Sequence, residues 1–189
     1  KKFCPNELRQ SRRMLDNAGI NTTADDYWAR IQELESRRPS AFGDRLQCGK
    51  VRSYREDVVE LSLGVLSTTA FGYANIDDGV NAVQTDADLQ LLFRIAMQCQ
   101  IIDDVMDFAK DCAGKLPGFL TASESLRESF ELTYHAARRY SSSDGIAQSR
   151  NLFPLRIAQV AVSGLANLLI TLERWRQRVP LVQSLPELR

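Results

Sequence analysis

Apolar residues recur along this chain at the three- and four-residue spacing of amphipathic helices, and no segment alternates apolar and polar residues as a half-buried strand does. Segments rich in glycine, proline, serine and aspartate separate the helical stretches. The pattern predicts helices over about residues 5–18, 24–38, 53–74, 86–110, 122–140 and 154–178. It predicts connections over 39–50, 75–85 and 111–117, and therefore an all-α bundle.

The last predicted helix carries apolar residues on one face. The residues on that side are Ile157, Ala161, Leu165, Leu168, Leu172 and Trp175. We expect the Trp175 ring to lie in the core or in a groove. The 189 residues, of which 44% are hydrophobic, suffice for one globular domain. We expect a single domain over 1–189, with peripheral helices and a loop in 1–49 and the bundle in 50–178.

Charge and cysteine content narrow the class of protein. Lys+Arg and Asp+Glu both number 24, so a zero net charge gives no electrostatic reason to expect nucleic acid or an anionic membrane as the main partner. No apolar run approaches the length of a membrane span, and we expect no stable membrane insertion. The four cysteines form no C-x-x-C pair, which favours a reduced, cytoplasmic protein without a zinc or redox motif.

The helix predicted over 86–110 changes abruptly from apolar residues to carboxylates. Asp103, Asp107 and Asp111 follow one another at four-residue intervals and share one stripe of the helix, with Asp104 beside it. Stacked carboxylates repel each other, and a helix C-terminus disfavours acids, so we expect a compensating cation. Mg²⁺ suits these oxygen donors, because it is usually held by one or two carboxylates plus substrate phosphates. A solvated acidic face is the alternative interpretation.

The acidic run and the loop after it, QIIDDVMDFAKD followed by AGKLP, resemble the second aspartate-rich motif of the trans-prenyl diphosphate synthases. The residues at the family's positions are Gln100, Asp103, Asp104, Asp107, Asp111, Gly114 and Lys115, with Cys99 where Phe is usual. In that family the motif binds Mg²⁺ that bridges to a substrate diphosphate, and the loop lysine closes over it. The resemblance implies Asp103, Asp104 and Asp107 as metal ligands. It also implies Asp103, Asp104 and Lys115 as catalytic residues, and Gln100 and Lys115 as substrate-binding residues.

A weaker similarity lies in the preceding helix. Where the family has a Lys-Thr pair that contacts diphosphate, this chain offers Arg52 and Arg55. Because arginine binds phosphate bidentately, we expect both to bind substrate; for Arg55 a solvated helix start is the alternative. The resemblance covers roughly residues 50–175 and implies the C-terminal portion of an isoprenoid-synthase-type bundle. The family's first aspartate-rich motif has no counterpart in these residues, since Ala29 stands where a third aspartate should follow Asp25-Asp26. Either that motif lies on a segment upstream of Lys1, or the protein works without it.

The resemblance implies a Mg²⁺-dependent prenyl transferase that forms isoprenoid diphosphates from allylic and isopentenyl diphosphates. It implies a homodimer, or a complex with a partner chain that supplies the first motif. Departure of the diphosphate would leave a carbocation in a dry, helix-lined cavity, and Phe93, Arg94 and Met97 are candidates to bound it. One alternative is a terpene cyclase of the same fold, although Trp175 stands where its second metal motif needs Glu. The other is a non-catalytic subunit or binding protein.

Overall fold

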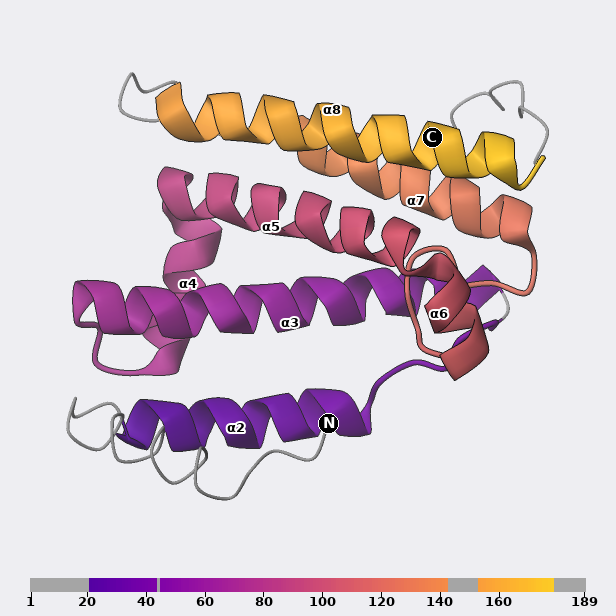
Figure 1. Cartoon of the computed structure of the whole chain (residues 1–189). Helices are drawn as coiled ribbons and strands as arrows, with labels where there is room; N and C mark the ends of the chain where they lie inside the picture. The colour runs from indigo at the N-terminus through magenta and orange to yellow at the C-terminus, as the bar shows by residue number, and fades with distance from the viewer. Residues whose placement is uncertain (1–20, 44, 143–152, 179–189) are drawn as a thin grey trace, which may run out of the picture.

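The computed structural model describes residues 21–43, 45–142 and 153–178 (Figure 1). This part of the chain forms seven helices and no strand, which confirms the all-α prediction. The helices are α2 (Asn21–Ser36), α3 (Arg45–Phe71), α4 (Ile76–Thr85), α5 (Ala87–Met106), α6 (Phe108–Gly114), α7 (Leu126–Ser141) and α8 (Phe153–Arg176). The helix predicted over 5–18 lies outside the described residues.

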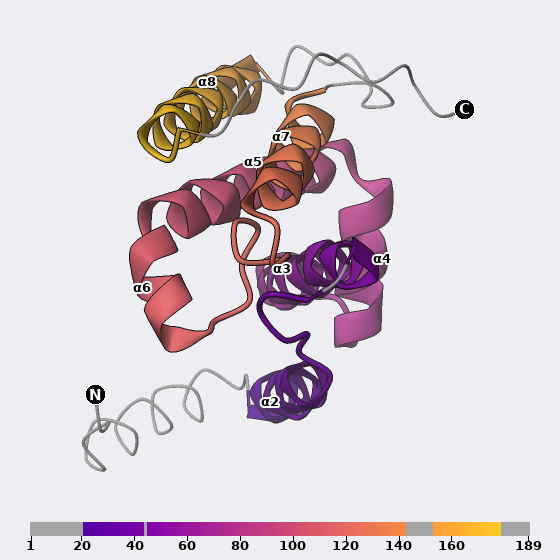
Figure 2. The same ribbon diagram turned by 90° about the vertical axis from the view of Figure 1, so that its right-hand side faces the viewer.

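Helix α5 occupies the middle of the bundle. It packs against α3 and α4 on one side and against α7 and α8 on the other (Figures 1 and 2). The apolar side of the last turns of α5 is held in the main core, because Met97, Ile101 and Val105 are buried there with Phe119 and Phe130. The carboxylates that follow therefore project from the end of a helix that the core holds in place.

Two segments predicted as loops are helical. Helix α3 begins at Arg45 rather than near Ser53, and residues 75–85 form α4 instead of a polar connection. The Asn75 side chain caps α4 by accepting a hydrogen bond from the backbone N–H of Asp78. Ile76 and Val83 are buried on the inner side of this short helix. Its polar outer face hid that apolar side in the sequence pattern.

The helix predicted to run to Lys110 divides at Asp107. Asp107 ends α5 and precedes α6, with φ −90° and ψ 6°. The backbone nonetheless keeps its one-turn spacing, because Asp107 N–H donates to Asp103 O at 2.8 Å and Asp111 N–H donates to Asp107 O at 2.9 Å. The three acids therefore stay one turn apart across the junction. Residues 111–114, predicted as loop, belong to α6.

Helix α8 turns its larger apolar residues outward. Its buried residues are Gln159, Ser163, Ala166 and Ile170. The larger apolar residues Leu165, Leu168, Leu172 and Trp175 are exposed. The expectation that the Trp175 ring lies in the core or in a groove was wrong, because this ring is 82% exposed. Small and polar side chains on α8 allow it to lie close against α5 and α7 instead.

Candidate functional site

Arg55 joins two other residues that the sequence singled out. Its Nη2 donates to Asp104 Oδ1 at 2.7 Å and to the carbonyl of Pro117 at 3.2 Å, and its Nη1 donates to Gln100 Oε1 at 3.2 Å. The side chain starts from the interior of α3 and is 22% exposed, so the alternative of a solvated helix start was wrong. One guanidinium thus links α3, α5 and the loop after α6.

Asp104 points inward and is occupied by protein groups. Its side chain is 2% exposed, and its Oδ2 accepts a hydrogen bond from the backbone N–H of Phe119 at 2.7 Å. Gly118 allows the loop to approach this closely, because a Cβ there would lie 3.0 Å from the carboxyl carbon of Asp104. Asp104 therefore ties the end of α5 to the following loop and to Arg55.

Burial raises the pKa of Asp104 to about 6, even though the Arg55 charge and the Phe119 N–H both favour the carboxylate. The nearby charges of Asp111 and Asp103 raise this pKa further. Desolvation is the dominant cause, as expected for a carboxyl withdrawn from water. The group is ionised at neutral pH but lies close enough to its pKa to titrate under mildly acidic conditions.

Asp103 and Asp107 of the acidic run face outward, whereas Asp111 is buried. Asp103 is exposed and Asp107 is half-exposed, and Lys110 Nζ donates to Asp107 Oδ2 at 2.5 Å. The pKa of Asp111 is raised first by burial and then by the charge of Asp107, with a smaller contribution from Asp103. The stripe therefore concentrates negative charge at the α5–α6 junction, beside the positive charges of Arg55 and Lys110.

The described residues include no group of three or more His, Cys, Asp or Glu side chains that could hold a metal ion among themselves. What the stripe does offer is two accessible carboxylates, Asp103 and Asp107, while Asp104 is turned away from solvent. This donor set fits a hard cation that keeps waters or takes substrate phosphates as its other ligands. It does not fit a closed site built from protein ligands alone.

Arg52 and Lys115 stand apart from this group. Arg52 pairs with Glu56 at 3.8 Å, one turn further along α3. Lys115 ends α6 in the left-handed conformation with φ 49°, and its side chain is exposed. Within the described residues no ion pair joins either one to the acidic stripe. The structure therefore brings together Arg55, Gln100 and Asp104, places Asp103 and Asp107 beside them, and leaves Arg52 and Lys115 outside.

Two parts of this site were missed from the sequence. Lys110 pairs with Asp107, and its position three residues later was the available signal. The loop at Pro117–Phe119 supplies a carbonyl and an N–H to the Arg55–Asp104 pair. Pro117-Gly118 signals a turn, but nothing in the sequence shows which side chain that turn approaches.

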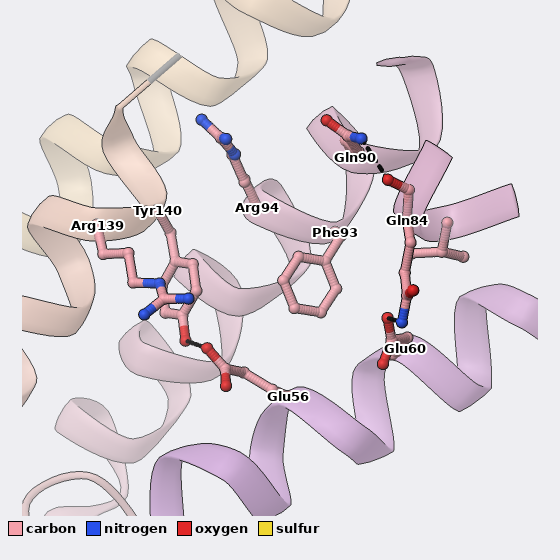
Figure 3. Close-up of a pocket in the computed structure, with 9 residues that line it drawn as sticks. Glu56, Glu60, Gln84, Gln90, Phe93, Arg94, Arg139 and Tyr140 are labelled. Carbon is pink, nitrogen blue, oxygen red and sulfur yellow. Dashed lines mark hydrogen bonds between the residues drawn. The ribbon is translucent and has the colours of Figure 1, made fainter. Parts of the chain in front are cut away.

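A pocket of about 290 Å³ opens between α3, α4, α5 and α7 (Figure 3). Phe93 and Arg94, the candidates to bound a carbocation cavity, line this pocket, whereas Met97 is buried in the core. Its other lining residues are Glu56, Glu60, Val83, Gln84, Gln90, Arg139 and Tyr140. Glu56 accepts a hydrogen bond from the Tyr140 hydroxyl at 2.6 Å, which together with burial raises the pKa of that phenol. Most of the pocket's lining residues are charged or amide residues, unlike the dry cavity expected for prenyl transfer.

No protein-family model, curated protein or solved structure matches this chain. The resemblance to prenyl diphosphate synthases rests on the residues of the acidic motif and its loop.

Proposed function

We propose that the chain binds an isoprenoid diphosphate through Mg²⁺ at the α5–α6 junction and takes part in prenyl transfer between allylic and isopentenyl diphosphates. The acidic stripe carries this proposal. Asp103, Asp107 and Asp111 remain one turn apart across the junction. Burial is the main cause of the raised pKa of Asp111, and repulsion from Asp107 and Asp103 raises it further. A divalent cation would relieve that repulsion and leave coordination positions for phosphate oxygens.

Different acids of the motif would have different tasks. Asp103 and Asp107 are the accessible carboxylates and would hold the cation, which when bound would stabilise the diphosphate as a leaving group. Asp104 would act as a positioning residue, because both its oxygens already accept hydrogen bonds from Arg55 and Phe119. The sequence-based assignment of Asp104 as a ligand remains a proposal that requires this pair to open.

Basic groups around the stripe would share the charge of the diphosphate. Arg55 lies behind the stripe, and its charge acts on both Asp104 and Asp111. Lys110 is exposed and donates to Asp107. It would either contact a phosphate or leave Asp107 when the cation binds there. Lys115 is exposed on the next turn and would approach the diphosphate from the loop side.

A non-catalytic diphosphate-binding subunit is the second candidate. Two observations favour it: Arg55 and Asp104 are bound to each other, and most residues that line the pocket beside α5 are charged or amide residues. In that case a partner chain would supply the first aspartate-rich motif and the apolar cavity. A homodimer, expected from the resemblance, remains part of the proposal.

Incubating the purified chain with isopentenyl diphosphate, an allylic diphosphate and Mg²⁺ tests these candidates. Longer prenyl diphosphates in the products would support the transferase, and released hydrocarbon or alcohol would support the cyclase. Diphosphate binding without turnover would support the binding subunit. Absence of both binding and turnover would contradict the site itself. Asp88→Ala, an exposed acid at the other end of α5, is the matched control and should behave as the unaltered chain.

A further inference from the structure

Helix α8 presents an uncharged apolar face to solvent along its full length. The large exposed residues on it are Phe153, Ile157, Val160, Leu165, Leu168, Leu172 and Trp175. Their spacing places them on one side of the helix. From Phe153 to Trp175 no charged residue is exposed, and Thr171 is the polar residue on this side. A soluble monomer rarely leaves an apolar surface of this extent uncovered.

The opposite side of α8 is attached to the bundle. Gln159 is buried, and its Nε2 donates to the carbonyl of Tyr140 at 3.0 Å at the end of α7. Ala166 and Ile170 belong to the main core. Figure 2 shows α8 at the edge of the bundle, with α5 and α7 on its inner side. The apolar face is therefore the outward one.

In the described part of the chain, α8 is the one helix long and apolar enough to cross a membrane by length and composition. From its sequence we expected an ordinary bundle helix here. A core helix that passes this test is mostly buried, but only 22% of the apolar window of α8 is buried. Because α5 and α7 hold its inner side, lipid cannot surround it. The geometry fits a helix that lies along a membrane surface rather than one that spans it.

The charged residues of α8 indicate what kind of partner its apolar face would bind. The charged residues of 153–178 are Arg156, Glu173, Arg174, Arg176 and Arg178, and Glu173 is paired with Arg176. Trp175 is 82% exposed between two of these arginines. Tryptophan prefers the headgroup level of a bilayer, and arginine is attracted to anionic lipid. Contact between two copies of α8 would bring like charges together. A parallel pair would place the two arginine-rich ends side by side, and an antiparallel pair would place Arg156 beside the arginine-rich end of the other copy.

We propose that the outer face of α8 binds the surface of an anionic membrane, with the apolar residues in the interface and Trp175 at the headgroup level. The zero net charge gave no reason to expect this partner, because it averages over the chain and conceals the local excess of arginine on α8. The proposal is independent of the diphosphate site, which lies at the α5–α6 junction.

Co-sedimentation of the whole chain with lipid vesicles tests the proposal. The chain should sediment with vesicles of phosphatidylcholine and phosphatidylglycerol, and much less with phosphatidylcholine alone. Raising the salt to roughly 0.5 M should weaken binding by screening the arginines. The double variant Val160→Glu, Leu168→Glu should bind at least about tenfold less, since each change puts a charge into the apolar interface. Leu66→Glu on α3 is the matched control, because Leu66 is 62% exposed and Leu168 is 55% exposed.

Fluorescence provides a second measurement. In a Trp28→Phe background, the emission of Trp175 should shift to shorter wavelength when anionic vesicles are added. Helical circular dichroism of each variant should match the unaltered chain, so that lost binding reflects the surface and not unfolding. The proposal would be overturned by a chain that binds neither kind of vesicle, or by a Leu66→Glu variant that loses as much binding as the α8 variant. A dimer that the α8 variant dissociates, without vesicle binding, would instead identify the face as a contact between copies.

Discussion

Replacing Arg55 with methionine would remove the charge that compensates the buried carboxyl of Asp104. The substitution keeps an unbranched apolar stem but deletes the hydrogen bonds to Asp104 Oδ1, Gln100 Oε1 and the Pro117 carbonyl. The Phe119 N–H then remains as a donor to Asp104. Breaking a buried ion pair from one side typically costs about 3–5 kcal/mol. Because Arg55 is 22% exposed, we expect about 3 kcal/mol at pH 7.5.

This cost should depend on pH in a definite direction. Asp104 has a folded-state pKa of about 6, above its ordinary value of 3.8, so folding favours the protonated form. The stability associated with this group is fully present below about pH 4 and falls by about 3 kcal/mol as the pH rises through 6. Losing Arg55 raises the pKa further, since its charge is what lowers it. The Arg55→Met variant should therefore be destabilised less at about pH 5 than at about pH 7.5.

Urea unfolding followed by circular dichroism at the two pH values measures both effects. Arg30→Met is the control, because it breaks the exposed ion pair between Arg30 and Asp77 at 2.6 Å and also removes one positive charge. It should cost at most about 1 kcal/mol. An Arg55→Met variant that matches this control, or that loses the same free energy at both pH values, would refute the interpretation of Arg55–Asp104 as a buried clamp.

Three further substitutions test the loop and the pocket. Gly118→Ala should destabilise the chain by about 1–2 kcal/mol in thermal unfolding, because its Cβ would crowd the buried carboxyl of Asp104. Gly49→Ala is the control, because a Cβ there has open space and should cost nothing. Equal effects of the two substitutions would contradict the close approach of Gly118 to Asp104. Lys115→Gly should stabilise the folded chain by about 1 kcal/mol, since glycine accepts φ 49° without strain. The same substitution should weaken binding of Mg²⁺-diphosphate, and unchanged binding would show that Lys115 is not part of the site. Tyr140→Phe should lower the free energy of unfolding by about 1 kcal/mol through loss of the 2.6 Å hydrogen bond to Glu56, and an unchanged urea midpoint would contradict that contribution.

The long helices were predictable because their apolar periodicity persists over several turns. Helix α4 was not, since its ten residues carry acids at the start and polar residues outside, with a short apolar side that packs against α3. The Gly64–Gly79 crossing explains that packing: a Cβ on Gly79 would lie 2.2 Å from Gly64 O. Such a close approach depends on two segments meeting in space. A local pattern of residues does not contain it.

The candidate site was predictable in its residues and less so in their partners. Gln100, Arg55 and Asp104 do come together, but Arg55 and Asp104 bind each other rather than standing open toward solvent. The sequence shows three acids on one stripe without showing which of their neighbours is buried. For α8 the apolar side was recognised, but Trp175 was expected in the core or in a groove, because periodicity identifies a face and does not say which way it points.

Isothermal titration of inorganic diphosphate in the presence of Mg²⁺ tests the proposed site most directly. The unaltered chain and Asp88→Ala should bind diphosphate in a Mg²⁺-dependent manner. Asp103→Ala with Asp107→Ala should weaken this binding by at least about tenfold, because it removes the two accessible carboxylates of the stripe. Binding that is unchanged in the double variant, or that persists without Mg²⁺, would contradict the assignment of the α5–α6 junction as a metal-diphosphate site.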